Sequence, residues 1–266
     1  MSDKLLTTPP GFRSGHIVIV GRPNVGKSTL FNMLVGERLS IVTPKPQTTR
    51  NNVLGILTSP TCQIMFLDTP GLLDPRYRLQ EVMRKQIQHA LEGVDVLLGI
   101  VDASNVDASF DRDVVRAIQA VDAPRIIVLN KVDLVGTDQV DRSLKLLRTG
   151  VSTKEVLPVS ALTGHNVPQL LSLLEEALPF GPRFYSEDTL TEQPERFFVA
   201  ELVREEIFAQ LRQEIPYSIA VEIDEFREEG TKAYIMANII VERNSQKGIV
   251  IGSRGRTLKA VGKGAR

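Results

Sequence analysis

The sequence predicts an α/β fold: a mostly parallel sheet with helices on both faces, followed by a smaller α+β unit. Three observations carry this prediction. Between residues 16 and 178, apolar β-branched runs typical of buried strands alternate with amphipathic runs of helical period. Four short polar motifs each follow directly after one of the apolar runs. Beyond residue 195 the alternation stops, and one helical run precedes two strand-like runs.

The composition is that of a soluble globular protein, since 42% of the 266 residues are hydrophobic and 24% are charged. Cys62 is the single cysteine, so a disulfide framework is excluded and a reducing cytoplasm is expected. No apolar run reaches the length of a transmembrane helix. We divide the chain into a polar tail (1–14), a first domain (15–179), a linker (180–195) and a second domain (196–266).

The first polar motif, Gly21–Ser28, has the spacing G-x-x-x-x-G-K-S and lies between a predicted strand (16–20) and a predicted helix (29–34). Such a loop turns its N–H groups toward a polyphosphate, with Lys27 reaching the β- and γ-phosphates and Ser28 binding Mg²⁺. A glycine-rich turn that binds nothing is the alternative, which the agreement of strand, spacing and helix disfavours. The nucleotide contacts expected here are Gly21, Arg22, Pro23, Asn24, Val25, Gly26, Lys27, Ser28 and Thr29.

The second motif, Asp68-Thr69-Pro70-Gly71, ends a strand-like run at 62–67. That run and the run at 53–58 predict a hairpin, which makes one sheet edge antiparallel. A carboxylate at a strand tip followed by a glycine turn suits a contact to Mg²⁺ and a loop that senses the γ-phosphate. An ordinary turn is the alternative. The polar residues 40–52 before this hairpin predict a mobile loop.

The remaining alternation completes the sheet. Predicted helices cover 76–92, 107–121, 140–148 and 166–178, and predicted strands cover 94–101, 125–129 and 155–159. The run at 94–101 is apolar almost throughout, as expected for a strand buried on both faces. Ligands of such sheets bind at the carboxyl ends of the strands, where all four motifs lie.

The third and fourth motifs predict guanine specificity. Asp133, in Asn130-Lys131-Val132-Asp133, can accept hydrogen bonds from N1 and the 2-amino group of guanine, a donor pair that adenine lacks. Asn130 can hydrogen-bond the base and tie neighbouring loops, and the Lys131 stem can lie over the ring. Ser160-Ala161 suits a backbone contact to the guanine carbonyl. We therefore expect GTP and GDP as ligands rather than ATP.

The second domain combines a predicted helix (197–212) and two predicted strands (219–223 and 232–242) with an excess of positive charge. After residue 230, eight basic residues stand against one acidic residue. Gly252-Ser253-Arg254-Gly255 fits the G-x-x-G loop with which KH domains clamp single-stranded nucleic acid. A helix-entry turn on a solvated basic face is the alternative. The RNA contacts expected here are Gly252, Ser253, Arg254, Gly255, Arg256 and Lys259.

In this order, the motifs resemble those of translation-factor-related GTPases of the TrmE-Era-EngA type. With Pro-Gln-Thr-Thr-Arg at 46–50 and the KH-like unit, the chain resembles the Era family of bacterial GTPases. The resemblance implies a P-loop NTPase domain that hydrolyses GTP, with Lys27, Thr49 and Gly71 as catalytic residues. It implies Mg²⁺ ligation by Ser28, Asp68 and Thr49, with the neighbouring Thr48 left open as an alternative to Thr49.

The same resemblance concerns the second domain. It implies a KH domain of type II that binds the 3′ end of 16S ribosomal RNA, and a part in assembly of the 30S subunit and in rRNA maturation. The family's KH fold continues beyond the helix that follows G-x-x-G with another helix and a strand. We therefore expect the second domain to be incomplete at Arg266.

Leu72 stands where Ras-like proteins carry the glutamine that orients the attacking water. Leucine cannot hydrogen-bond water, so we expect backbone groups to place the water and intrinsic hydrolysis to be slow. Asn24 matches a residue that helps to hold K⁺ in several relatives with a hydrophobic residue at this position. A loop-capping amide is the alternative role for Asn24.

Two other function classes stay open. A P-loop kinase for small molecules would need an acceptor pocket and would make Asn130–Asp133 a coincidence. A nucleotide-regulated interaction protein at a membrane surface would use its basic segment on lipid rather than RNA. We expect a cytoplasmic monomer, and peripheral contact with the inner face of the cell membrane is the open alternative for its location.

Overall fold

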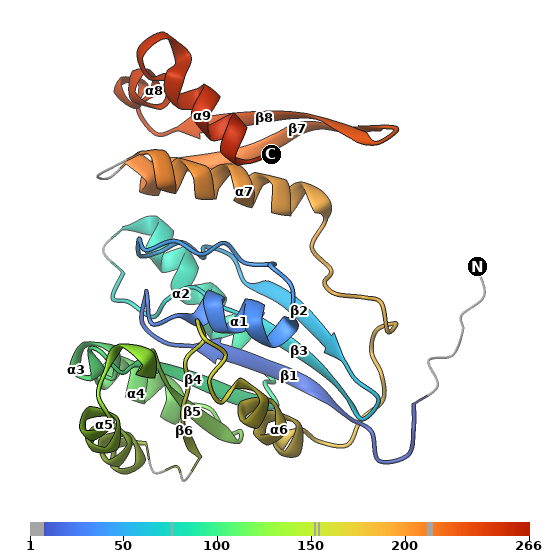
Figure 1. Cartoon of the computed structure of the whole chain (residues 1–266), viewed down its shortest axis with the longest axis vertical. Helices are drawn as coiled ribbons and strands as arrows, with labels where there is room; N and C mark the ends of the chain where they lie inside the picture. Colours follow the sequence, from blue (N-terminus) through green and yellow to red (C-terminus); the bar gives the residue numbers. More distant parts are fainter. Residues whose placement is uncertain (1–7, 76, 152, 154, 212–214) are drawn as a thin grey trace. The chain divides into compact units, whose positions relative to one another are not determined.

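The structure is a computed structural model that describes residues 8–266 except 76, 152, 154 and 212–214. The chain divides into two compact units (Figure 1). One comprises the residues up to Ser40 together with Thr49–Glu192, and the other comprises Ile41–Thr48 together with Gln193–Arg266. Residue 76, where one predicted helix begins, and residue 212, where another ends, lie outside the described residues.

The first unit is built on a six-stranded sheet in the order β2-β3-β1-β4-β5-β6. Neighbouring strands are parallel except β2 and β3, which form the predicted antiparallel edge hairpin. The prediction of a mostly parallel α/β sheet is therefore confirmed. The strands are β1 (Arg13–Val20), β2 (Val53–Thr58), β3 (Cys62–Asp68), β4 (Val96–Asp102), β5 (Arg125–Asn130) and β6 (Val156–Pro158).

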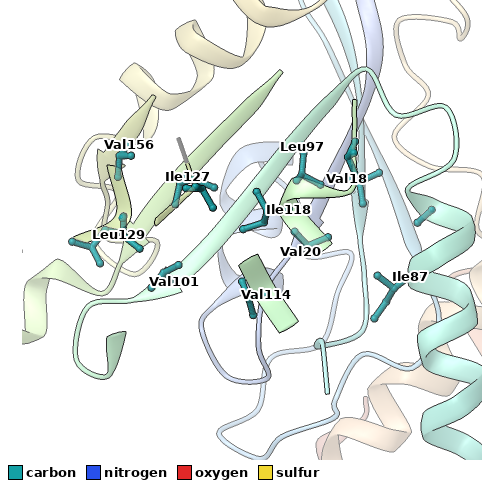
Figure 2. Packing of buried hydrophobic residues seen from close by; sticks show 14 of the residues in the cluster. Val18, Val20, Ile87, Leu97, Val101, Val114, Ile118, Ile127, Leu129 and Val156 are labelled. Atoms are coloured by element: carbon teal, nitrogen blue, oxygen red, sulfur yellow. The ribbon is translucent and has the colours of Figure 1, made fainter. Parts of the chain in front are cut away.

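Helices cover both faces of this sheet (Figure 1). Ile87, Ile118 and Leu147 belong to one buried cluster. In this cluster Ile87 and Ile118 pack with strand residues such as Val18 and Leu97 (Figure 2). The strand β4 is buried along its whole length, as its apolar sequence predicts. The helices of this unit are α1 (Lys27–Val35), α2 (Arg78–Ala90), α3 (Val106–Ser109), α4 (Arg112–Gln119), α5 (Thr137–Gly150) and α6 (Val167–Ala177).

The prediction of one helix over 107–121 is wrong, because the structure divides this segment into α3 and α4. Asp111 is the N-cap of α4, and its side chain accepts hydrogen bonds from the N–H groups of Asp113 at 3.0 Å and Val114 at 3.2 Å. An aspartate cap satisfies donors that a continuous helix would pair internally. Hydrophobic period does not reveal such a break, since Val114 and Ile118 still face the core at helical spacing.

Part of the segment 180–195 packs on the first unit. The side-chain oxygen of the buried Gln63 in β3 accepts hydrogen bonds from the N–H groups of Phe184 at 2.8 Å and Tyr185 at 2.9 Å. In β2, Ile56 donates its N–H to the carbonyl of Leu190 at 2.8 Å. The bond to Leu190 covers part of the outer edge of β2, whose backbone groups could otherwise pair with another chain.

The second unit packs helices against a two-stranded antiparallel sheet, as the α+β prediction requires. Its elements are α7 (Glu195–Gln210), β7 (Ile219–Glu229), β8 (Lys232–Val241), α8 (Asn244–Ile251) and α9 (Arg256–Gly264). Its buried core consists of Ile207, Leu211, Ile219, Val250 and Val261. Helix α8 was not predicted, because its eight residues include Gly248 and lack a clear apolar stripe. Across the described residues, every helix is too short or too polar to cross a membrane.

The segment Ile41–Thr48 belongs to the second unit through contacts with α7 and the residue after it. Lys45 Nζ donates hydrogen bonds to the carbonyl of Phe208 and, at 2.5 Å, to the carbonyl of Leu211. A lysine in this position satisfies carbonyls that the end of a helix leaves unpaired. The predicted loop at 40–52 is therefore divided, because its two flanks belong to the first unit.

Candidate functional site

The loop Gly21–Ser28 joins β1 to α1 at the carboxyl end of the strand. The helix begins at Lys27, two residues before its predicted start, and Gly26 is its N-cap in the left-handed region at φ 97°. A Cβ atom on Gly26 would lie 2.3 Å from Nδ2 of Asn130, so a side chain does not fit there. The loop therefore directs the N-terminus of a nine-residue helix into its own interior, an arrangement that binds phosphate.

Lys27 is buried at the base of this loop, with 6% of its surface exposed. Its Nζ donates a hydrogen bond to the carbonyl of Arg22 at 2.9 Å. Burial lowers the pKa of Lys27 to about 8, while the negative charge of Asp68 acts in the opposite direction. An added anion would stabilise the charged lysine strongly, because the site is shielded from water.

Ser28, Thr49 and Asp68 form one hydrogen-bonded cluster. Ser28 Oγ lies 2.7 Å from Asp68 Oδ2 and 2.9 Å from Thr49 Oγ1. Asp68 is buried, and burial raises its pKa while the charge of Lys27 opposes that rise. Within the described part of the chain, Asp68 Oδ1 has no hydrogen-bond partner. Two hydroxyls beside a carboxylate with an unsatisfied oxygen fit Mg²⁺, which takes oxygen ligands and keeps several waters.

The two neighbouring threonines have different surroundings. Thr48 Oγ1 donates a hydrogen bond to the carbonyl of Lys45 at 2.8 Å and lies 2.8 Å from Thr43 Oγ1. Its hydroxyl therefore stabilises a turn within its own loop. Thr49 Oγ1 points instead into the cluster, where it lies 3.4 Å from Asp68 Oδ2.

The second motif is fastened to the strand and loop of the first. Thr69 Oγ1 donates a hydrogen bond to the carbonyl of Ile19 at 2.6 Å. Gly71 lies so close to Pro23 that a Cβ atom on the glycine would be 2.7 Å from the proline nitrogen and Cγ. The absence of a side chain at Gly71 thus allows the two loops to touch, which couples the position of one to the other.

Asn130 joins the third motif to the first and the fourth. Its Nδ2 donates to the carbonyl of Val25 at 2.8 Å, and its Oδ1 accepts from the N–H of Ala161 at 2.9 Å. With 1% of its surface exposed, the side chain is fully used within the protein. Asn130 therefore fixes the loops that surround the expected guanine pocket.

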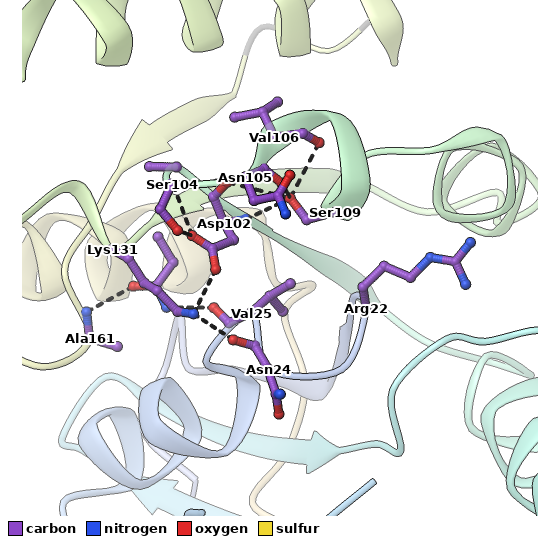
Figure 3. Close-up of polar contacts among 12 residues, drawn as sticks. Arg22, Asn24, Val25, Asp102, Ser104, Asn105, Val106, Ser109, Lys131 and Ala161 are labelled. Carbon is purple, nitrogen blue, oxygen red and sulfur yellow. Dashed lines mark hydrogen bonds and ion pairs between the residues drawn. The ribbon is translucent and has the colours of Figure 1, made fainter. Parts of the chain in front are cut away.

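The side chain of Lys131 contacts the loop Gly21–Ser28, which we call the phosphate loop. Its backbone is in the left-handed region at φ 64°, and its Nζ donates to the carbonyl of Asn24 and to Asp102 Oδ2, both at 2.6 Å (Figure 3). Asp102, the last residue of β4, was missed by the sequence analysis. Its place at the carboxyl end of a buried strand was the signal that could have found it.

Asp133, the predicted reader of guanine, lies in a one-turn 3-10 helix, η1 (Val132–Leu134), and is exposed. The left-handed Lys131 turns the chain from β5 into this turn. Hydrogen bonds link the loops that carry six of the predicted nucleotide contacts in the first unit. These six residues are Gly21, Asn24, Val25, Asn130, Lys131 and Ala161. An exposed carboxylate beside these loops can receive the edge of a base.

Arg22 differs from the other predicted nucleotide contacts. Figure 3 shows its side chain directed away from Asn24 and Val25. The guanidinium donates from Nε to Asp111 Oδ2 at 2.6 Å. Its backbone carbonyl accepts a hydrogen bond from Lys27.

The predicted RNA-contacting residues lie together in the second unit. The 3-10 turn η3 (Ser253–Gly255) follows Gly252 and ends at Gly255, which is the N-cap of α9; both glycines have positive φ, 72° at Gly252 and 74° at Gly255. The charged side chains of this loop and of the first turn of α9 are exposed; they are Arg254, Arg256 and Lys259. A helix N-terminus with exposed cations, preceded by glycines that have no side chain, can approach the phosphates of a nucleic acid closely.

Comparison with known proteins identifies two families along the chain. Residues 16–131 match the 50S ribosome-binding GTPase family, and residues 214–266 match the KH domain family. The chain is 44% identical to GTPase Era of Geobacter metallireducens over 96% of this chain and 86% of that protein. It is 47% identical to GTPase Era of Geobacter sp. strain M21 over 94% of this chain and 85% of that protein.

Two solved structures are similar over nearly the whole chain. A crystal structure of Era in complex with MgGDPNP and nucleotides 1506–1542 of 16S ribosomal RNA aligns with a TM-score of 0.90 and 37% identity, covering 96% of this chain and 87% of that one. A crystal structure of a single-residue variant of Aquifex aeolicus Era bound to GDP·AlF4⁻ aligns with the same TM-score and identity, covering 96% and 88%.

Proposed function

The chain belongs to the Era family of GTPases, and from this premise we propose that it is a GTP-hydrolysing switch that binds single-stranded ribosomal RNA. One observation carries the nucleotide part of this proposal. Asn130 ties together the loops that follow β1, β5 and β6, while Ser28 and Asp68 meet beside the buried Lys27. That arrangement can hold a base at one end and a polyphosphate with its metal at the other.

Guanine is the base that this site favours. Asp133 carries an exposed carboxylate that can accept two hydrogen bonds from the guanine edge, and hydrogen bonds to a charged group are stronger than neutral ones. ATP offers no matching donor pair. A P-loop kinase with adenine specificity would need a different residue at this position.

Nucleotide competition tests the proposal. Unlabelled GTP should displace fluorescent GDP from the wild-type protein, and ATP should not at similar concentrations. Asp133→Asn should weaken GDP binding by a factor on the order of 100 and improve binding of xanthine nucleotides, since hydrogen bonds to a charged group contribute roughly 1.5–3 kcal/mol each. Asp138→Asn, an exposed carboxylate in the following helix, is the control. Equal competition by ATP and GTP would overturn the guanine assignment.

We propose that Ser28 and Thr49 bind Mg²⁺ directly and that Asp68 binds it through water. The unsatisfied Asp68 Oδ1 supports this role, as does the hydrogen bond between the two hydroxyls. When bound, Mg²⁺ neutralises the charge that develops on the β- and γ-phosphate oxygens. Thr49 is favoured over Thr48, because the Thr48 hydroxyl is engaged in its own loop.

Hydrolysis then depends on positioning and charge rather than on a protein base. We propose that Lys27 supplies positive charge at the β- and γ-phosphates and that the backbone of Gly71, which ends the D-x-x-G loop (Asp68–Gly71), senses the γ-phosphate. We propose K⁺ as an additional source of positive charge, held with the help of Asn24. Replacing Na⁺ by K⁺ should raise turnover in the wild type and not in Asn24→Ala, and equal turnover in both salts would exclude the role.

The second unit supports the RNA part of the proposal. Exposed cations surround the Gly252–Gly255 loop, and KH domains bind four nucleotides of a single strand with such a loop. The similar Era structure contains nucleotides 1506–1542 of 16S ribosomal RNA. We therefore propose the 3′ end of 16S rRNA as the ligand and assembly of the 30S subunit, including rRNA maturation, as the process, with the protein acting as a cytoplasmic monomer.

A peripheral membrane role is the second candidate, because the same basic segment could contact anionic lipid. Binding to single-stranded RNA and to vesicles containing anionic lipid, each across a salt series, separates the two. The RNA proposal expects tight binding to RNA that weakens in Arg254→Ala and only weak vesicle binding. RNA affinities that are equal with GDP and with a GTP analogue would contradict the switch.

A further inference from the structure

The side chain of Arg22 is held outside the phosphate loop by two carboxylates of the neighbouring helix. Its Nε lies 2.6 Å from Asp111 Oδ2, and its Nη2 lies 3.0 Å from Asp113 Oδ2 and contacts Asp111 as well. The arginine side chain is 17% exposed. Because a partly buried pair of this kind fixes the planar guanidinium, its third nitrogen has a defined direction.

That third nitrogen binds the D-x-x-G loop. Arg22 Nη1 donates to the carbonyl of Leu72 at 2.9 Å, and the N–H of Leu72 donates to the carbonyl of Gly21 at 3.0 Å. Two consecutive residues of the phosphate loop therefore hold both backbone polar groups of the residue that follows Gly71. A loop held at one residue from both sides loses much of its freedom to move relative to the phosphates.

Leu72 is the residue whose counterpart orients water in Ras-like proteins. Its side chain is apolar and packs against the buried cluster that contains residues of β1 and β4. The alignment of water and γ-phosphate must then come from backbone groups of this loop, and a displacement of about 1 Å can reduce a rate on the order of 100-fold.

We propose that Arg22 is a positioning residue for GTP hydrolysis: anchored by Asp111 and Asp113, it fixes the backbone of Leu72 and so the D-x-x-G loop against the γ-phosphate. This inference rests on the proposed function. It assigns the P-loop arginine a part in the reaction rather than in nucleotide affinity, because its guanidinium points away from the loop interior.

Asp111 provides a selective way to weaken this anchor. Its Oδ1 caps α4, while its Oδ2 binds Arg22. Asparagine is as good an N-cap as aspartate, so Asp111→Asn keeps the helix cap and removes the charge that holds the guanidinium. Arg112, the exposed next residue, provides the control Arg112→Ala.

The test compares single-turnover hydrolysis at saturating GTP with equilibrium GDP affinity. We expect Arg22→Ala to slow hydrolysis on the order of 10- to 100-fold while GDP affinity changes by less than about threefold. Arg22→Lys should restore part of the rate. Asp111→Asn should slow hydrolysis less than Arg22→Ala and add nothing to it in the double variant, because both act through one contact. Arg112→Ala should behave as the wild type.

Three results would overturn the inference: an unchanged rate in Arg22→Ala, a rate loss matched by an equal loss of GDP affinity, or additive losses in the double variant. Should Arg22→Ala not fold, Arg22→Lys and Asp111→Asn decide the question by the same two measurements. A wild-type protein that does not hydrolyse GTP would instead overturn the proposed function, and the inference with it.

Discussion

Lys131 Nζ lies 2.6 Å from Asp102 Oδ2, and this ion pair sets the lysine over the loop that follows β1 (Figure 3). Asp102 is itself held in place, because its Oδ1 accepts hydrogen bonds from the hydroxyl of Ser104 at 2.6 Å and its N–H at 2.9 Å. The side chains of Lys131 and Asp102 are 29% and 13% exposed, so water screens the pair only in part. The stem that is expected to cover the guanine ring therefore depends on a residue of the neighbouring strand.

We predict that Asp102→Asn weakens GDP binding. The asparagine has one side-chain oxygen for the two donors of Ser104 and the ammonium of Lys131, so Lys131 loses its charged partner, at a cost of about 1 kcal/mol or roughly fivefold in Kd. Displacement of fluorescent GDP measures the effect, which should appear mainly as faster dissociation. Asp107→Asn, an exposed carboxylate in α3, is the control. Identical dissociation rates for Asp102→Asn and the wild type would show that the pair has no part in binding.

The two threonines give a second prediction. Thr49→Ala should raise the Mg²⁺ concentration needed for half-maximal hydrolysis by about tenfold or more, because one hydroxyl ligand is lost. Thr48→Ala should leave that concentration nearly unchanged, since its hydroxyl binds Lys45 and Thr43. A Mg²⁺ titration of GTP hydrolysis in both variants measures this difference. The reverse order of effects would assign the metal to Thr48.

The lowered pKa of Lys27 leads us to predict that nucleotide affinity depends on pH. Its pKa of about 8 lies far below the usual value for lysine, because the side chain is buried. Phosphates favour the charged form, so binding takes up a proton above pH 8, and GDP affinity should fall by up to about tenfold per pH unit there. Calorimetry between about pH 7 and about pH 9 measures this fall together with the proton uptake.

The matched variant for this prediction is Lys27→Arg, because arginine stays charged throughout the pH range. Ionisation of the guanine ring acts on both proteins alike, so the difference between them isolates the lysine. Wild-type affinity that follows the same pH profile as Lys27→Arg would show that the lysine keeps its proton in the nucleotide-free protein.

The close approach of Gly71 to Pro23 yields a fourth prediction. A methyl group at Gly71 would lie 2.7 Å from the proline ring, so Gly71→Ala must push the D-x-x-G loop away from the phosphate loop. GTP hydrolysis should fall on the order of 100-fold, with a smaller loss of GDP affinity. Gly136→Ala, where a Cβ atom meets nothing within 4 Å, is the control. Normal single-turnover hydrolysis in Gly71→Ala would mean that the loop has room to adjust.

The fold class could be predicted from the sequence alone, and so could the strand-end positions of the motifs at the nucleotide site. Strand, loop and helix around Gly21–Ser28 follow each other directly, and the strand-end positions of Asp68 and Asn130 follow from local apolar runs. Such features are readable because hydrophobic period and motif spacing depend on neighbours along the chain. The antiparallel edge strand and the α+β character of the second unit were predictable for the same reason.

Tertiary structure alone decided which side chains meet. The sequence favoured Thr49 over Thr48 only through the family resemblance, missed Asp102, placed Asp111 inside one helix and gave no partner for the side chain of Arg22. The contacts of Thr49, Asp102 and Arg22 depend on partners at least 19 residues away, as the pairs Thr49–Asp68 and Arg22–Asp111 illustrate. The break before α4 depends on the N-cap that Asp111 forms in place of a continuous helix. Burial of such polar groups is costly unless they are paired, so the folded packing selects their partners, and no local pattern records that choice.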